Sequence, residues 1–191
     1  TFPGHGYLYE EGLVNSTDGR VRPFDAAASG TVFGDAVGAV VLKREADALR
    51  DDDAILATML GFGVSNDGAR KAGYAAPGVA GQRAAVGAAL RMAGVDAASI
   101  SYVECHATGT LIGDGIELRA LSEAYRAAGA PPAAGAAAKT CAIGSVKGNI
   151  GHANAAAGVT GLIKAALCLQ RATLVPTAHY ASLSPRVTLD A

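Results

Sequence analysis

Two segments of the sequence have the same features in the same order: a short apolar run, a histidine in a loop of small residues, and a helical pattern. In the first segment, an apolar run over residues 100–104 leads to His106 and then to a helix of about three turns over residues 116–124. In the second, an apolar run leads to His152 and then to a predicted helix over residues 153–170. Strands that alternate with helices favour an α/β layered fold, in which helices cover both faces of a central sheet.

Other patterns predict further elements on either side of the first histidine. Apolar runs predict strands over residues 36–42 and 54–64. Apolar residues at helical spacing predict a helix over residues 82–94, and Gly94 suits its end. Residues 127–139 are rich in alanine, proline and glycine and predict an exposed connector.

The composition excludes several classes of partner. Of the 191 residues, 50% are hydrophobic and 17% are charged, and the formal net charge is −1. Such a chain can bury a core, but it has no basic field that attracts nucleic acid or an anionic membrane. The most apolar stretch, residues 153–169, is interrupted by Lys164 and predicts a buried helix rather than a membrane span.

The three cysteines, Cys105, Cys141 and Cys168, form no CxxC pair. Their odd number argues against a secreted disulfide framework and favours a reducing, cytoplasmic location. The first twelve residues also lack the charged-then-apolar pattern of a secretory signal. A metal site built from Cys105, Cys141 and the two histidines is an alternative, but these residues lack the short paired spacing of zinc ligands. We therefore predict no metal.

The two histidines are the strongest candidates for chemistry. The sequence lacks the GxSxG motif of nucleophile-elbow hydrolases and the GxxxxGK[ST] motif of phosphate-binding loops. Taken alone, His106 or His152 is a core histidine beside a turn. Both, however, follow predicted strands at the edge where an α/β sheet meets a ligand crevice. Both also lie among glycine, threonine and asparagine, which allow close backbone approach and hydrogen bonding.

Long stretches around the histidines resemble a known family. ECHATGTLIGDGIE, followed by IGSVKGNIGHANAAAGVTGLIKAAL, resembles the β-ketoacyl synthase family, whose pattern is HGTGT, then GDPIE, then K-x-N-x-GH. RPFDAAASGTVFGDAVGAVVLKR and SNDGARKAGYAAPGVAGQ resemble the ketosynthase domains of modular polyketide synthases in particular. The resemblance runs from about Tyr7 to Pro185, nearly the whole chain.

The resemblance implies a partial thiolase-like fold, an α/β layered arrangement with helices over mixed sheets. Residues 1–50 would end the N-terminal half of a ketosynthase domain, and residues 51–191 would form most of its C-terminal half. The implied activity is that of an acyltransferase: decarboxylative Claisen condensation of a malonyl-type extender with an acyl chain held on a cysteine. The extender arrives on the phosphopantetheine arm of an acyl carrier protein, and no cofactor binds the domain directly.

The same resemblance implies a role for each residue of the motifs. His106 and His152 would be the paired histidines that donate hydrogen bonds to the enolate left by loss of CO2. Neutral imidazoles can donate without protonating that enolate, and a nearby Lys147 ammonium would lower their proton affinity. Glu117 would pair with Lys147 and hold it in place. The alternative for Glu117 is an ordinary solvated charge on a helix.

Other motif positions carry substrate-binding or tolerated roles. Thr108 and Thr110 match family threonines that hydrogen-bond the pantetheine arm, and we group Asn149 with them as substrate-binding. Turn formation at a strand end is the alternative role for the threonines. The family usually has glycine at Ala107 and proline at Gly115. Alanine is acceptable at Ala107 unless that position needs a positive φ.

None of the three cysteines fits the acyl-accepting cysteine of the family, since each has the context of a small buried hydrophobe. The nucleophile is therefore expected outside this chain, before Thr1, and residues 1–191 alone are expected to be inactive. A homodimer formed through the preceding part is implied by the resemblance only. The alternative function is a non-condensing ketosynthase-like module that binds or transfers carrier-bound acyl chains. Such modules often lose the first histidine, whereas His106 is present. The acyl chain and extender unit remain open.

Overall fold

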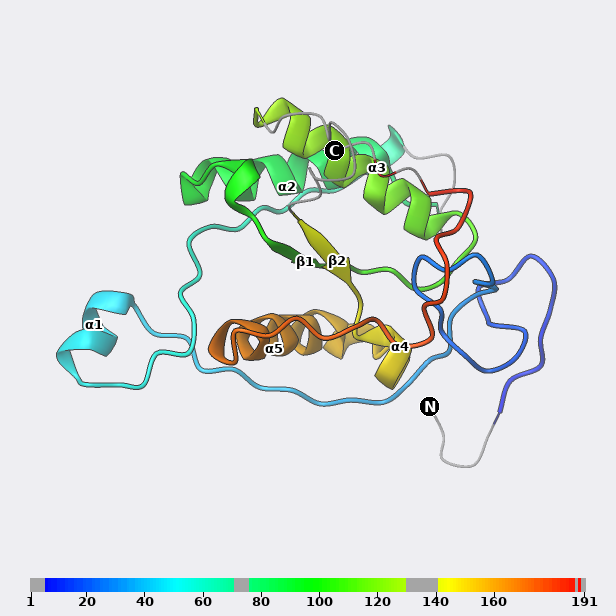
Figure 1. Ribbon diagram of the computed structural model, residues 1–191, viewed down its shortest axis with the longest axis horizontal. Helices are drawn as coiled ribbons and strands as arrows, with labels where there is room; N and C mark the ends of the chain where they lie inside the picture. Colours follow the sequence, from blue (N-terminus) through cyan, green and yellow to red (C-terminus); the bar gives the residue numbers. More distant parts are fainter. Residues whose placement is uncertain (1–5, 71–75, 130–140, 188, 190–191) are drawn as a thin grey trace.

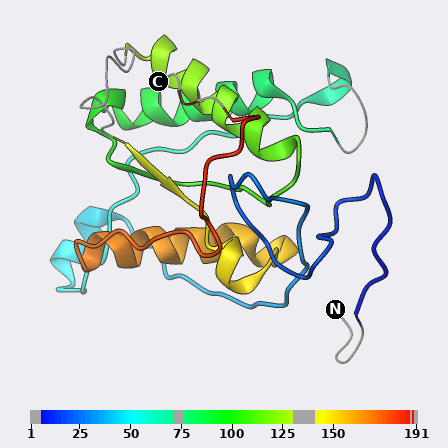
Figure 2. The same cartoon turned by 45° about the vertical axis from the view of Figure 1, so that its right-hand side comes forward.

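A computed structural model describes residues 6–70, 76–129, 141–187 and 189. Its elements, in chain order, are α1 (Glu45–Arg50), η1 (Gly68–Arg70), α2 (Val79–Ala93), η2 (Ala97–Ser99), β1 (Tyr102–Glu104), α3 (Gly113–Ala127), β2 (Ala142–Gly144), α4 (Lys147–Ile150), η3 (Asn154–Ala156) and α5 (Ala157–Gln170). The strands β1 and β2 lie between two helical layers, with α2 and α3 on one side and α5 on the other (Figure 1). The turned view in Figure 2 keeps the same separation.

The two strands form a parallel pair. Tyr102 lies opposite Ala142 and Glu104 opposite Gly144, and the Cys105 N–H continues the ladder by donating to the Gly144 carbonyl at 2.8 Å. The strands predicted before His106 and before His152 are therefore both present, although each spans only three residues. Because the strands are parallel, the segments that follow them leave from the same edge of the sheet.

The helices of the upper layer start earlier than predicted. The predicted helix 82–94 begins at Val79 and ends before Gly94, whose φ of 63° closes it in the left-handed conformation. The helix predicted over 116–124 begins at Gly113 and runs to Ala127. It thus takes the first residue of the predicted connector, of which residues 130–139 lie outside the described part.

Two apolar clusters connect the upper helices to the sheet. One joins the end of α2 and the turn after it to α3, and the other joins the end of β1 to α3 and to two distant loops. The first cluster contains Leu90, Ala97 and Tyr125. The second contains Phe24, Cys105, Ala107, Leu118 and Val187. The histidine loop after β1 therefore starts from a packed layer rather than from a free strand end.

The region after β2 differs from the sequence prediction. A loop was expected before His152, but residues Lys147–Ile150 form the short helix α4. The single helix predicted over 153–170 is also wrong at its start: a 3-10 turn precedes α5, which begins at Ala157. The reason is Asn154, whose φ of 48° lies in the left-handed region and cannot continue an α-helix.

The strands predicted over 36–42 and 54–64 are wrong for the described residues. Both segments are open traces in Figure 1, and apolar side chains along them are exposed, including Val41 at 97% and Met59 at 54%. A strand requires a hydrogen-bonded neighbour. The first segment instead crosses α5, and the second crosses α2 so closely that a Cβ on Gly63 would meet the Ala85 carbonyl oxygen.

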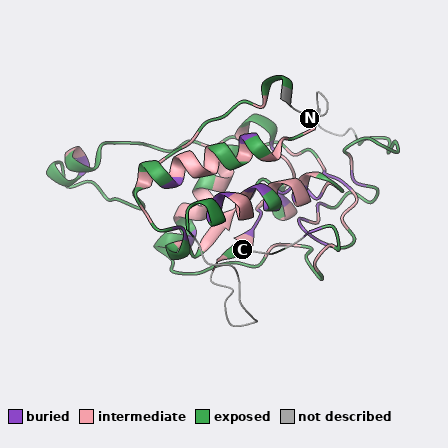
Figure 3. Cartoon of the chain, turned by 90° about the horizontal axis from the view of Figure 1, so that it is seen from above, coloured by how far each residue is buried: buried purple, intermediate pink, exposed green. Residues whose placement is uncertain are grey.

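Helix α5 is less buried than predicted. Of its residues only Cys168 is buried, and Leu169 is 68% exposed. Figure 3 shows this mixture of exposed and half-buried positions along the helices. Within the described ranges, none of the helices is both long and apolar enough to cross a membrane.

Candidate active site

The first histidine is held by a carboxylate that reaches back from α3. Glu117 accepts the backbone N–H of His106 at 2.6 Å and that of Ala107 at 2.8 Å, one on each carboxylate oxygen. These two donors follow β1, where the ladder to β2 has ended. The carboxylate therefore replaces the missing strand neighbour and fixes the backbone that carries the His106 ring. Glu117 is not the solvated helix charge of the alternative reading.

The second histidine is fixed from a distant loop. The His152 N–H donates to the Val32 carbonyl at 2.7 Å, and the Gly34 N–H donates to the His152 carbonyl at 3.2 Å. The Phe33 ring stacks on the imidazole, with centroids 5.8 Å apart and planes 28° apart. The Asn154 N–H donates to His152 Nδ1 at 3.2 Å. A neutral imidazole that accepts at Nδ1 carries its proton on Nε2, so Nε2 is the available donor.

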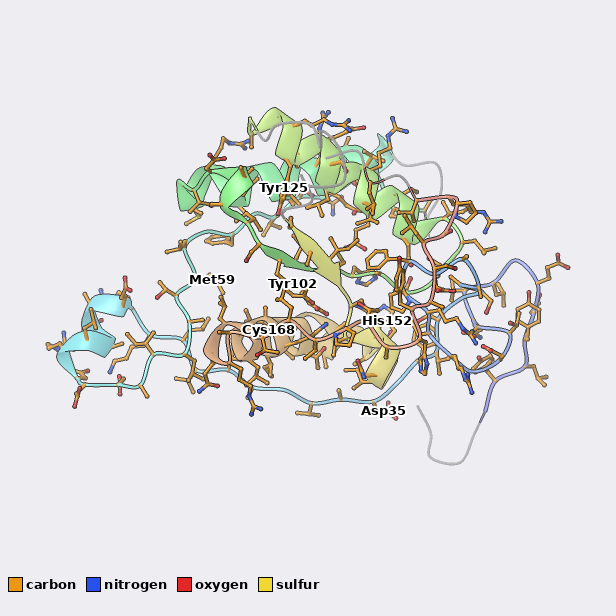
Figure 4. All side chains as sticks on the ribbon, in the orientation of Figure 1. Asp35, Met59, Tyr102, Tyr125, His152 and Cys168 are labelled. Carbon is orange, nitrogen blue, oxygen red and sulfur yellow. The ribbon has the colours of Figure 1, made fainter. Side chains whose placement is uncertain are left out.

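The two histidines face one another. Their ring centroids lie 5.0 Å apart and their planes meet at 83°, an edge-to-face contact. His106 comes from the segment after β1, and His152 follows α4 after β2 (His152 is labelled in Figure 4). The sheet thus brings together two residues that lie far apart in the sequence. This pair is the centre of the candidate site.

Lys147 is the first residue of α4, and its charge acts on both histidines. The residue is 4% exposed, and its backbone N–H donates to Ser145 Oγ at 3.3 Å. Burial lowers the pKa of the Lys147 ammonium, while the carboxylates of Glu117 and Glu104 act in the opposite direction. No ion pair joins Lys147 to Glu117 in the described part of the chain. The predicted direct pairing of Glu117 with Lys147 is therefore not present; Glu117 accepts the His106 and Ala107 N–H groups instead, and its charge raises the pKa of Lys147 without contact.

The surroundings of both histidines favour the neutral imidazole. The pKa of His106 is lowered to about 4, first by burial, then by the Lys147 charge and then by His152. The pKa of His152 is lowered by burial and by Lys147. His106 keeps an exposed face, so solvent screens part of this effect. At neutral pH both rings are hydrogen-bond donors without a net charge.

A titration tests these causes. In the Lys147→Met variant the pKa of His106 rises, because the positive charge of Lys147 is lost, but it stays below 6.5 because burial remains. NMR of histidine-labelled protein measures the midpoint, and Lys43→Met, which removes an exposed lysine paired with Asp51 and Asp53, is the control. An unchanged His106 midpoint in Lys147→Met would show that the lysine charge does not reach the ring.

The same pKa shift has a consequence for stability. The unfolded imidazole titrates near 6.5 and the folded His106 near 4, so between these values the unfolded chain binds more protons. The contribution of His106 is complete above about pH 6.5 and is lost as the pH falls toward 4. Thermal unfolding over this range is expected to show a falling melting temperature.

The predicted substrate-binding residues separate into two groups. Thr108 is buried and its Oγ1 lies 3.2 Å from Thr110 Oγ1, so the two threonines form one polar pair beside the histidine loop. Asn149 lies on α4 with an exposed side chain. Alanine at position 107, where the family usually has glycine, causes no backbone strain, because the φ of Ala107 is not positive. Gly115 lies inside the first turn of α3 rather than in a turn before it.

Two residues of the site were missed by sequence reasoning. Asp114 is buried and accepts the Phe24 N–H at 2.8 Å and the Gly109 N–H at 3.1 Å, which connects α3 to a loop 90 positions earlier. The charged residue between two glycines could have indicated from the sequence that Asp114 has a structural role. Phe33 is the other, and nothing in its local sequence marks it as a partner of a histidine.

Gly151 precedes His152 and has a conformation that other residues avoid. Its φ is 72°, and a Cβ there would lie 2.7 Å from the Val32 carbonyl oxygen, the acceptor of the His152 N–H. Gly151→Ala is therefore expected to lower stability by about 1–3 kcal/mol and to displace His152. Thermal unfolding measures the loss. Gly158→Ala, in α5 with open space around the added methyl, should be neutral or stabilising. Equal effects of the two changes would contradict the argument.

The surroundings of two cysteines disfavour the thiolate form. Cys105 is buried, and burial raises the pKa of its thiol well above the ordinary value. Burial also raises the pKa of Cys141. Within the described ranges, no group of three or more histidine, cysteine, aspartate or glutamate side chains is placed to hold a metal ion.

Two neutral imidazoles at the ends of parallel strands, with a buried lysine beside them, define an α/β site that can stabilise an oxyanion. Comparison with known proteins gives the family. Residues 56–181 match the C-terminal domain of beta-ketoacyl synthase, and residues 3–48 match its N-terminal domain. The chain belongs to the beta-ketoacyl synthase family.

Similar proteins are synthases of polyketides. The chain is 45% identical over 185 residues to a phenolphthiocerol/phthiocerol polyketide synthase of Mycobacterium tuberculosis, and 41% identical to polyketide synthase PksN of Bacillus subtilis. These alignments cover 97% of the chain but only 12% and 3% of those proteins. The resemblance to modular polyketide synthases is thereby confirmed.

Solved structures give the fold. The ketosynthase from module 1 of the bacillaene synthase of Bacillus amyloliquefaciens superposes with a TM-score of 0.88 at 40% identity, and ketosynthase twelve of the bacillaene polyketide synthase from the same species with 0.85 at 38%. Both matches cover 96% of this chain and 32% of theirs, so the chain spans about a third of a solved ketosynthase. The predicted thiolase-like α/β fold is confirmed for that part.

Proposed function

We propose that this chain carries the enolate-stabilising half of a ketosynthase active site that performs decarboxylative Claisen condensation in polyketide synthesis. The observation that carries the proposal is the His106–His152 pair, with ring centroids 5.0 Å apart in surroundings that keep both rings neutral. Paired neutral donors suit a reaction in which negative charge develops on a single oxygen.

The steps follow from that geometry. Loss of CO2 from the malonyl thioester breaks a C–C bond and leaves its electron pair on the α-carbon and the thioester oxygen. The N–H groups of His106 and His152 converge on that oxygen, and one such donor is typically worth about 2.7–4 kcal/mol in the transition state. The α-carbon then attacks the acyl thioester, a new C–C bond forms, and the cysteine thiolate leaves. Burial and Lys147 hold the imidazole pKa values low, so each ring donates an N–H without charge.

The substrates come on a carrier. We infer an acyl carrier protein as partner, with its phosphopantetheine arm beside the Thr108–Thr110 pair, which offers two hydroxyls 3.2 Å apart. Asn149 is exposed on α4, in the segment that carries His152, and would contact the phosphopantetheine arm from that side. We further propose that a cysteine other than Cys105, Cys141 and Cys168 accepts the acyl chain. The protein would act as a homodimer in the cytoplasm.

The direct test uses the full-length protein that contains residues 1–191. Malonyl carrier protein labelled in its free carboxyl group is supplied with and without an acyl donor. We expect release of labelled CO2 and, with the donor, a β-ketoacyl carrier product. A protein that accepts or passes on acyl chains but releases no CO2 would instead support the non-condensing module.

The cysteines of this chain are expected to stay free of acyl groups. Cys105 and Cys168 are buried, and burial raises the thiol pKa of Cys105 and of Cys141, so little thiolate is present at neutral pH. Incubating the polypeptide of residues 1–191 with an acyl thioester and digesting it for mass spectrometry checks this. Stable acylation of Cys105 would overturn the assignment of the nucleophile to another position.

A further inference from the structure

A second charge cluster, mostly shielded from solvent, lies on the face of β1 opposite to Val103, which packs on the apolar core. Lys164 Nζ of α5 lies 2.8 Å from Glu104 Oε2, and the two side chains are 11% and 9% exposed. The Tyr102 hydroxyl donates to the same oxygen at 2.5 Å, and Lys164 lies 5.6 Å from the centre of the Tyr102 ring. Figure 4 shows Tyr102 between the sheet and α5, on the side where Cys168 also lies.

The other oxygen of Glu104 reaches the active-site segment. Glu104 Oε1 accepts the backbone N–H of Val146 at 2.6 Å, across 42 positions of sequence. Val146 is the residue before α4, and its own side chain cannot cap the helix. Lys147 follows directly, and His152 comes two residues after the end of α4. One buried carboxylate thus connects β1 and α5 to the start of the turn that carries both Lys147 and His152.

The backbone of α5 and β2 approaches this cluster closely. A Cβ on Gly161 of α5 would lie 3.3 Å from Glu104 Cγ, and a Cβ on Gly144 would lie 2.6 Å from the Tyr102 hydroxyl. The Glu104 carboxylate is held by three partners, Lys164, the Tyr102 hydroxyl and the Val146 N–H. A buried ion pair often stabilises a fold no more than apolar residues of the same size would. Stability alone therefore does not account for the Glu104–Lys164 pair, and the pair can instead serve to position a neighbouring group.

We propose that Glu104 is a positioning residue of the active site: supported by Lys164 and Tyr102, it anchors the Val146 N–H and so sets where Lys147 and His152 stand relative to His106. This inference rests on the proposed function for its catalytic consequence, but the anchoring itself does not. No contact between Glu104 and substrate is required.

The test compares two double variants in the full-length protein. Glu104→Gln with Lys164→Met removes both charges but keeps a side-chain oxygen that can accept the Val146 N–H. Glu104→Leu with Lys164→Met removes both charges and the acceptor. Replacing the pair as a unit avoids leaving a lone buried charge, so both proteins are expected to fold. The Leu/Met variant is expected to melt several degrees lower than the Gln/Met variant, because it leaves the Val146 N–H without its acceptor.

Two readouts separate positioning from stability. We expect kcat for CO2 release from malonyl carrier to fall at least about tenfold in the Leu/Met variant relative to the Gln/Met variant, with KM within about twofold, because a lost hydrogen bond to a charged or polar partner is of this size. Amide hydrogen exchange at Val146 should be about tenfold faster or more in the Leu/Met variant.

The outcomes are distinguishable from a failure of the proposed function. Equal rates and equal Val146 exchange in the two double variants would overturn the positioning role, as would losses that simply follow the melting temperature. If the wild-type protein releases no CO2, the proposed function fails, and the exchange comparison alone then decides whether Glu104 anchors α4.

Discussion

Replacing His152 with alanine lowers the rate of CO2 release from malonyl carrier by about 10²–10³-fold, the usual cost of removing one donor to a developing oxyanion. The His152 backbone is fixed by Val32 and Gly34, and its Nδ1 accepts the Asn154 N–H, so Nε2–H is aimed before substrate arrives. A donor that needs no reorganisation contributes its full effect in the transition state. His106→Ala is expected to cost a similar factor.

The control for this prediction is another histidine of the chain. His179 is exposed and has a φ of 63°, so asparagine, which tolerates that conformation, is the suitable replacement. His179→Asn should leave the rate unchanged. The double variant His106→Ala with His152→Ala should lose less than the product of the single losses, because the two donors act as a unit. A His152→Ala protein that keeps its melting temperature and its rate would refute the role of the pair.

The histidine pair could be predicted from sequence because its information is local. His106 and His152 each follow a strand, and parallel strands end at the same edge, so their proximity required only the fold class. The effect of the Lys147 charge on both rings was also predicted, but the tautomer of His152 could not be predicted in that way. The tautomer depends on the Asn154 N–H at Nδ1. The His152 ring also stacks on Phe33, which comes from a loop far earlier in the sequence.

The errors in the fold have a similar cause. The apolar runs over residues 36–42 and 54–64 have strand composition, but composition does not specify a hydrogen-bonding neighbour, and these segments cross helices instead. Lys147 was expected in a loop, whereas α4 buries it, and that burial is what lowers its pKa. The functional groups and the effect of the Lys147 charge could be predicted from the sequence, whereas the burial that lowers the histidine pKa values most could not.

Glu117→Ala is expected to lower the decarboxylation rate by about 10–100-fold and to lower stability by roughly 1–3 kcal/mol for each backbone donor left unpaired. The variant removes the acceptor of the His106 and Ala107 N–H groups, so the segment after β1 loses its substitute for a strand neighbour. It also removes the carboxylate that opposes the lowered pKa of Lys147, and the ammonium becomes easier to deprotonate.

Two further variants identify which of these effects matters. Glu117→Gln keeps one oxygen acceptor and loses the charge, so its rate should lie between those of the wild type and Glu117→Ala. Glu123→Gln, six residues along the same helix, breaks only partly exposed pairs with Arg83 and Arg119, which contribute little to stability. If Glu123→Gln and Glu117→Ala change the rate and the melting temperature equally, Glu117 acts only as a helix charge. If Glu117→Gln is as slow as Glu117→Ala, either the charge or the second acceptor oxygen is essential. Near-recovery would show that one oxygen, holding one strand-end N–H, is enough to keep His106 in place.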